Sequence, residues 1–90
     1  MTKLTLNNGA VLEDASALLS SGNLFLYMYN SDLRTIFDLL IEPENTEEIT
    51  YTQVNGEDVV YRGFNKLTAV RDEGGGLITA VLRKEESENG

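Results

Sequence analysis

The chain has 90 residues, enough for one domain around a single hydrophobic core. It contains no cysteine and no histidine, which excludes disulfides, thiolate zinc sites, cysteine nucleophiles and Ser-His-Asp triads. Its formal net charge of -8 predicts repulsion from DNA, RNA and anionic lipid, so a basic protein is a better partner than a nucleic acid.

The N-terminal segment predicts a β-hairpin. Residues 3–6 alternate polar and apolar side chains, as in a strand with one buried face, and Asn-Asn-Gly at 7–9 tolerates a positive φ. Residues 10–13 are the expected returning strand. Residues 14–21 fit either a short helix that stops before Gly22 or a further strand, and the pattern leaves both open.

Residues 24–29 are apolar and rich in aromatic side chains, with Gly22-Asn23 before them and Asn30 after them. A short continuous apolar run of this kind is typical of a strand that is covered on both faces. We therefore expect a central strand here.

The clearest periodic pattern predicts an amphipathic helix at residues 31–41. Ser31 is a favourable N-cap, and Asp32 in the first turn suits the helix dipole. Pro43 ends the helix, because the residue before a proline avoids the helical region. The helix should pack on a sheet through an apolar stripe formed by Leu33, Ile36, Phe37, Leu40 and Ile41.

Two further hairpins are predicted in the C-terminal half. After an acidic loop at 44–48, strands at 49–54 and 57–64 flank Asn-Gly at 55–56, the dipeptide most typical of a two-residue turn. Such a turn would place Tyr51 opposite Val60. Strands at 67–71 and 77–83 flank the acidic, glycine-rich segment 72–76.

These elements predict an α+β fold. We expect a mostly antiparallel curled sheet or small open barrel of about six or seven short strands, with the helix at about 31–41 packed on it. Residues 1–83 would form the domain and residues 84–90 a flexible acidic tail. The alternating start differs from a signal peptide, and the longest apolar stretch is much shorter than the ~20 residues that span a bilayer.

Acidic residues beside turns are the main candidates for catalysis. Carboxylates are paired at 47–48, 57–58 and 72–73, and a hydrolase needs only two of them. Turn tips, however, do not give the burial that perturbs an acid. The segment 72–76 has neither the spacing of a calcium loop nor a phosphate-binding glycine pattern. We therefore expect no enzyme activity, no metal and no cofactor.

Protein binding is the better supported chemistry. Tyrosine is enriched at binding hot spots, which makes Tyr51 and Tyr61 candidates, whereas Tyr27 is expected in the core. Acidic side chains near the helix end could imitate the phosphate spacing of DNA, although a surface charged for solubility explains them as well. The candidate protein-binding residues are Glu42, Glu44, Glu47, Glu48, Glu57, Asp58, Tyr51 and Tyr61.

Several segments of the chain resemble small proteins encoded by tailed phages and prophages of Gram-positive bacteria. They are LTLNNG at 4–9, ITY at 49–51 with VYRGF at 60–64, and LTAVRDE at 67–73 followed by ITAVL at 78–82. Such proteins are associated with tail and baseplate gene modules. The resemblance covers most of the chain and implies no defined active site.

The expected function is therefore that of a non-catalytic phage-type protein that acts by protein–protein binding. It would be a small structural component of a virion tail or baseplate, bound to a phage structural protein, and homo-oligomer formation is one option. The alternative is an acidic, nucleic-acid-mimicking inhibitor of a basic host defence enzyme, of the anti-CRISPR or anti-restriction type. A two-carboxylate hydrolase and a nucleotide sponge rank lower. The expected location is the host cytoplasm or the virion.

Overall fold

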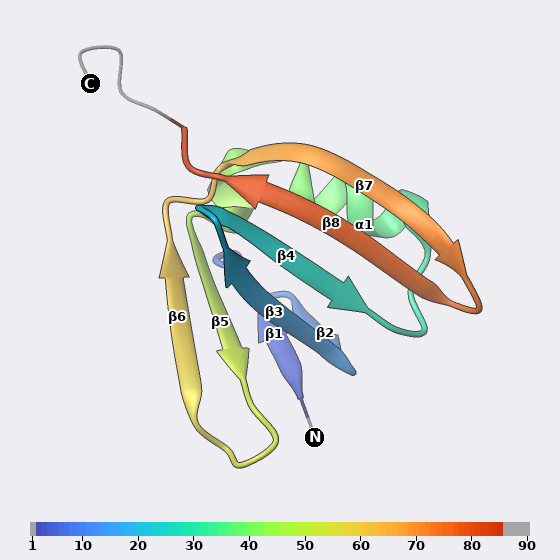
Figure 1. Cartoon of the computed structure of the whole chain (residues 1–90), viewed down its shortest axis with the longest axis horizontal. Coiled ribbons are helices and arrows are strands. Elements are labelled where there is room, and N and C mark those ends of the chain that lie inside the picture. Colours follow the sequence, from blue (N-terminus) through green and yellow to red (C-terminus); the bar gives the residue numbers. More distant parts are fainter. Residues whose placement is uncertain (1, 86–90) are drawn as a thin grey trace.

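Eight strands form two antiparallel four-stranded sheets in the computed structural model, which describes residues 2–85 (Figure 1). The first sheet has the order β2-β1-β5-β6 and the second the order β3-β4-β8-β7. The α+β class is confirmed, but two sheets replace the single curled sheet, and they do not close into a barrel. The strands are β1 (Lys3–Thr5), β2 (Val11–Glu13), β3 (Ala15–Ser20), β4 (Asn23–Met28), β5 (Glu48–Thr52), β6 (Asp58–Arg62), β7 (Lys66–Gly74) and β8 (Leu77–Arg83).

The N-terminal hairpin forms as predicted, and its second strand leads directly into the second sheet. The N–H of Leu6 donates to the carbonyl of Ala10 at 2.8 Å, and Gly9 has a φ of 93°. Residues 15–20 form strand β3, which settles the helix-or-strand question. Only Asp14, with a φ of 56°, separates β2 from β3. The chain therefore bends at Asp14 and passes from one sheet to the other.

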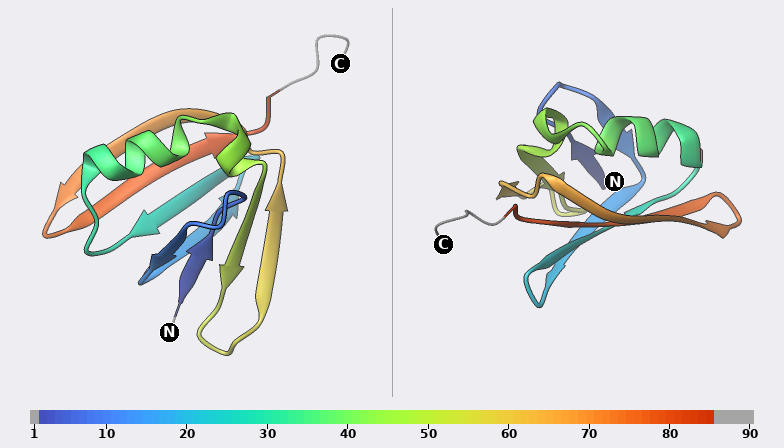
Figure 2. Two further views of the ribbon diagram at one scale, coloured as in Figure 1. Left: turned by 180° about the vertical axis from the view of Figure 1, so that it is seen from behind. Right: turned by 90° about the horizontal axis from the view of Figure 1, so that it is seen from above.

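Strand β4 is central, as predicted, because it pairs with both β3 and β8. The expectation that both of its faces are covered was wrong. Leu24, Leu26 and Met28 are fully buried, whereas the alternate residues Phe25 and Tyr27 are only half-buried. Helix α1 (Leu33–Leu40) lies over one face of the second sheet, as Figure 2 shows from above. The period of two along a strand sends every second side chain to the opposite face.

Helix α1 is shorter than predicted and has a different cap. Asp32 is the N-cap in place of Ser31, and its side chain accepts a hydrogen bond from the N–H of Thr35 at 3.1 Å. The expected acidic loop begins with a 3-10 turn, η1 (Pro43–Thr46), which has Pro43 at its start. Among residues 2–85, no helix combines the length and the apolar composition needed to cross a bilayer.

The apolar stripe of α1 is only partly covered. Ile36 and Leu40 are buried against the sheets, as expected. The other three residues lie on the flank of the helix and keep 39–44% of their surface exposed. The prediction of a fully packed stripe was therefore wrong for Leu33, Phe37 and Ile41.

The β5–β6 hairpin forms, but its register differs from the predicted one. Tyr51 lies opposite Val59, not Val60. The N–H of Gly56 donates to the carbonyl of Gln53 at 2.8 Å, and Gly56 has a φ of 88°. The turn thus contains one residue more than a two-residue turn, as in a type I turn followed by a glycine bulge.

Strands β7 and β8 form a long hairpin whose pairing shifts twice, between Leu67 and Ala69 and between Asp72 and Gly74. Of the predicted tail at 84–90, residues 86–90 lie outside the described residues. The core lies between the two sheets and α1, and partly buried apolar residues surround it. Its buried apolar members are Leu4, Leu6, Ala15, Ala17, Leu24, Leu26, Met28, Ile36, Leu40, Ile49, Phe64, Ile78, Ala80 and Leu82.

Candidate protein-binding face

The face of the second sheet that points away from α1 carries an apolar row across all four strands. Leu18 on β3 lies opposite Phe25 on β4. Val81 on β8 lies opposite Phe25 on one side and Ala69 on β7 on the other. Leu18 keeps 55% of its surface exposed. We call this surface the outer face; it consists of Leu18, Phe25, Tyr27, Ala69, Arg71, Glu73, Thr79 and Val81.

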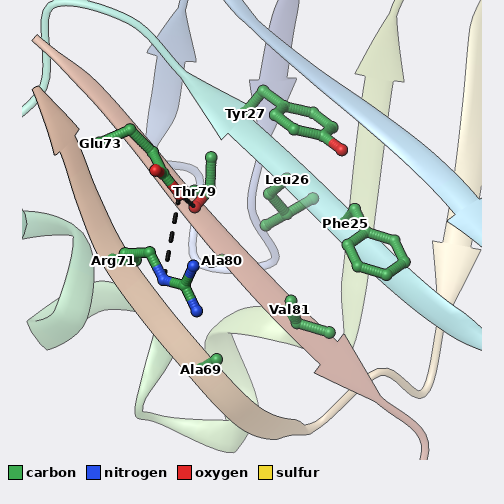
Figure 3. A pocket seen from close by; sticks show the side chains of 9 residues that line it. All are labelled: Phe25, Leu26, Tyr27, Ala69, Arg71, Glu73, Thr79, Ala80 and Val81. Carbon is green, nitrogen blue, oxygen red and sulfur yellow. Dashed lines mark hydrogen bonds and ion pairs between the residues drawn. The ribbon is translucent and has the colours of Figure 1, made fainter. Parts of the chain in front are cut away.

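A cluster of three polar side chains borders the apolar row on the outer face. The hydroxyl of Thr79 donates to Glu73 Oε2 at 2.9 Å, and Arg71 Nε lies 4.0 Å from the same oxygen. Figure 3 shows these three side chains at one end of the hollow, with Phe25 and Tyr27 along the neighbouring strand. The contacts tie the ends of β7 and β8 together and leave donor groups of Arg71 facing solvent.

The hollow on the outer face is shallow. Its volume of ≈ 270 Å³ is below the ~300–1,000 Å³ of sites that enclose small molecules. Within residues 2–85, no three acidic side chains come close enough together to hold a metal ion. A partly exposed apolar row with a polar border has the character of a protein-binding surface.

The structure places the predicted tyrosines in different surroundings. Tyr51 and Tyr61 are half-buried and pack against the core from the first sheet. The ring of Tyr61 meets that of Phe64 edge to face, with centroids 6.3 Å apart. Tyr27, expected in the core, lies on the outer face instead. The most exposed tyrosine in the described part of the chain is Tyr29, which follows β4.

The predicted acidic residues form two groups, not one array. Glu42 and Glu44 lie at the surface around η1, and β5 begins at Glu48. The other two acids of the set, Glu57 and Asp58, are at the opposite end of the β5–β6 hairpin (Figure 1). The structure thus brings the members between 42 and 48 together and separates them from the pair at 57 and 58.

Several of these acids take part in contacts that stabilise the fold. Glu47 accepts a hydrogen bond from Asn65 Nδ2 at 3.1 Å. Glu48 forms an ion pair with Arg62 at 3.4 Å, and Asp58 accepts a hydrogen bond from the hydroxyl of Thr52 at 2.7 Å. All three carboxylates bridge neighbouring segments, and because the contacts are exposed, each stabilises the fold only weakly.

The apolar row is the feature that the sequence patterns missed. In residues 77–83 the polar Thr79 and Arg83 alternate with the apolar Ile78, Ala80 and Leu82, and such alternation indicates a sheet with one free face. The continuous apolar run at 24–29 concealed the same alternation in β4, since both of its faces are apolar. In the sequence, the alternation that indicates the free face carrying Phe25 and Val81 was therefore visible only in β8.

Comparison with known proteins yields no relative. No protein-family model, curated protein or solved structure matches the chain. The resemblance to phage tail and baseplate proteins stays a prediction.

Proposed function

We propose that this chain is a non-catalytic protein that binds another protein through the outer face. The observation that carries the proposal is the row of Leu18, Phe25, Val81 and Ala69, which crosses an uncovered sheet face. Single exposed apolar residues are ordinary on protein surfaces, but a contiguous row with a polar border is typical of an interaction site. The lack of histidine and cysteine supports a non-catalytic role.

We also propose the biological setting, a structural or assembly role in a phage tail or baseplate. Its support is the sequence resemblance described above. Assembly proteins work through their surfaces and need no enclosed site, which agrees with a shallow apolar hollow on a small domain.

The proposal can be tested by comparing three immobilised proteins: the wild type, Leu18→Asp and Val54→Asp. Leu18 is in the apolar row, whereas Val54 is at the tip of the β5–β6 hairpin and is 78% exposed. Both substitutions add one negative charge at an exposed apolar site, so folding should survive in both. The proteins would be incubated with lysate of infected cells, and bound proteins identified by mass spectrometry.

We expect one defined protein to be retained by the wild type and by Val54→Asp, and to be lost with Leu18→Asp. A virion structural protein as the retained partner would support the assembly role. A basic host enzyme would support the inhibitor role instead. Equal retention by all three proteins, or no specific retention by the wild type, would contradict binding through the outer face.

A further inference from the structure

Strand β6 has a free edge that no bulge interrupts. It forms the margin of the first sheet and pairs only with β5 among the described residues (Figure 1). Its five residues pair without a register shift, whereas β7, at one edge of the other sheet, shifts twice. Bulges, prolines, short length and charged side chains, especially lysine, normally prevent an edge strand from pairing with another chain. Strand β6 has no bulge, lysine or proline, and its two charged residues, Asp58 and Arg62, have opposite signs.

Two hydrogen bonds at the ends of the hairpin determine which backbone groups of β6 are free. The N–H of Gln53 donates to the carbonyl of Glu57 at 2.8 Å, and the N–H of Gly63 donates to that of Glu47 at 2.9 Å. Residues in an antiparallel strand alternate in the side to which they bond, so the odd-numbered residues bond to β5. The residues whose N–H and C=O groups point outward are Asp58, Val60 and Arg62.

We propose that two copies of the chain pair edge to edge through β6, antiparallel and around a twofold axis at Val60. The outward groups then match one another, because Val60 faces Val60 and Asp58 faces Arg62 of the second copy. Each such pair exchanges two backbone bonds, so the seam contains ~6 of them. The result is one continuous sheet that extends through both copies.

Charge complementarity selects this partner and this direction. In the antiparallel arrangement, Asp58 of each copy faces Arg62 of the other, so the seam has two opposite-charge pairs on one sheet face. A parallel arrangement would place like charges together. Arg62 would also retain its ion pair with Glu48 at 3.4 Å, so its guanidinium would lie between two carboxylates. Val59 faces Tyr61 of the second copy on the other sheet face, which is a favourable cross-strand pair.

The experiment uses two charge-reversal variants. Each variant by itself should disrupt the seam, and the two mixed together should restore it. In Asp58→Arg, two arginines face each other at both ends of the seam, and in Arg62→Asp, two aspartates do. In an equimolar mixture, each introduced charge faces its opposite in the other chain, and native Arg62 of the first variant faces native Asp58 of the second. Mass in solution would be measured by analytical ultracentrifugation up to ~1 mM, because so small an interface is weak.

We expect a wild-type dimer, association at least ~10-fold weaker for each single variant, and recovery of the dimer in the mixture. The matched controls are Asp38→Arg and Arg34→Asp, which change the net charge equally at the exposed ion pair on α1 and should leave the dimer intact. Circular dichroism would confirm that every variant is folded.

A wild type that stays monomeric at ~1 mM, or a mixture that associates no better than its components, would overturn the proposal. A dimer that survives either single reversal would overturn it too. The inference goes beyond the proposed function, since it uses the other sheet and a different partner. Leu18→Asp leaves β6 unaltered, so failure at the outer face and failure at the β6 seam are distinguishable.

Discussion

Asp32 organises the first turn of the helix with a single carboxylate oxygen. Asp32 Oδ2 accepts both the hydroxyl hydrogen bond of Thr35 at 2.8 Å and its backbone hydrogen bond at 3.1 Å. The hydroxyl contact is the main cause that lowers the pKa of Asp32, and the backbone contact adds to it. Both bonds are stronger to a charged acceptor, so the folded state favours the ionised form.

The helix cap should therefore give a pH-dependent stability. Because folding lowers the pKa of Asp32, its contribution is complete above the pKa of the unfolded chain, about 3.9. It is lost as the pH falls through the lower pKa of the folded state. We expect Asp32→Ala to melt below the wild type at pH 7, with a gap that narrows on acidification.

Thermal unfolding followed by circular dichroism, at several pH values, would measure this gap. Asp38→Ala is the matched control, since Asp38 is an exposed acid on the same helix. A gap for Asp32→Ala that stays constant down to acid pH would show that the charge of the carboxylate does not contribute.

At the scale of the element, the β5–β6 hairpin shows how tertiary packing selects one register out of two. Asn-Gly at 55–56 correctly predicted a hairpin, but that dipeptide fits two turns that differ by one residue. A shift of one residue exchanges the two faces of a strand. In the observed register, Tyr51 and Val59 lie opposite each other and Tyr61 packs against the core. Tertiary packing therefore decided what local sequence left ambiguous.

Replacement of Gly56 tests this turn. Its φ of 88° is one that side chains disfavour, and a Cβ there would meet no atom within 4 Å. Any cost therefore comes from the backbone alone. We expect Gly56→Val to lower the free energy of unfolding by about 1–3 kcal/mol, and Gly56→Asn by less, because asparagine tolerates positive φ.

Urea unfolding of the two variants would give the comparison. An equal decrease in the free energy of unfolding for Gly56→Val and Gly56→Asn would contradict a turn whose geometry depends on positive φ at this position.

At the scale of the whole molecule, the sequence predicted local elements better than their assembly. The helix and three of the four hairpins follow from short patterns of turn residues and periodicity, whereas the β3–β4 hairpin was left open because residues 14–21 fitted a helix as well as a strand. The division into two sheets depends on the pairing of β1 with β5 and of β4 with β8, which join segments far apart in the chain. No local pattern encodes such pairings, since they are selected by which faces bury together.

The same reason explains why the candidate site could not be predicted from the sequence. Leu18 and Phe25 become neighbours of Val81 only when β4 and β8 pair. The charged residues chosen from the sequence are near turns and were easy to find, but several of them stabilise the hairpin that contains them. The exposed side of an apolar strand could be recognised only after the helix had been placed on the other side.

The two faces of the second sheet should respond differently to the same substitution. Leu26 is fully buried on the inner side, whereas Leu18 is mostly exposed on the outer face. We expect Leu26→Ala to cost about 2–5 kcal/mol, a large part of the ~5–15 kcal/mol that stabilises a domain. Leu18→Ala should cost less than about 1 kcal/mol, because it opens no cavity.

Urea unfolding would measure both variants in parallel. A large decrease in the free energy of unfolding for Leu18→Ala would contradict the conclusion that the outer face is exposed to solvent.

Strands β1 and β8 are the first and last strands of the described chain, and both are interior in their sheets. β1 lies between β2 and β5, and β8 lies between β4 and β7. During synthesis, β4 and β7 would leave the ribosome before the strand that joins them exists. The second sheet therefore cannot be completed until Arg83, the end of β8, has emerged. Until then, β4 and β7 each lack the partner strand between them, and unpaired strand edges in an incomplete chain favour misassembly.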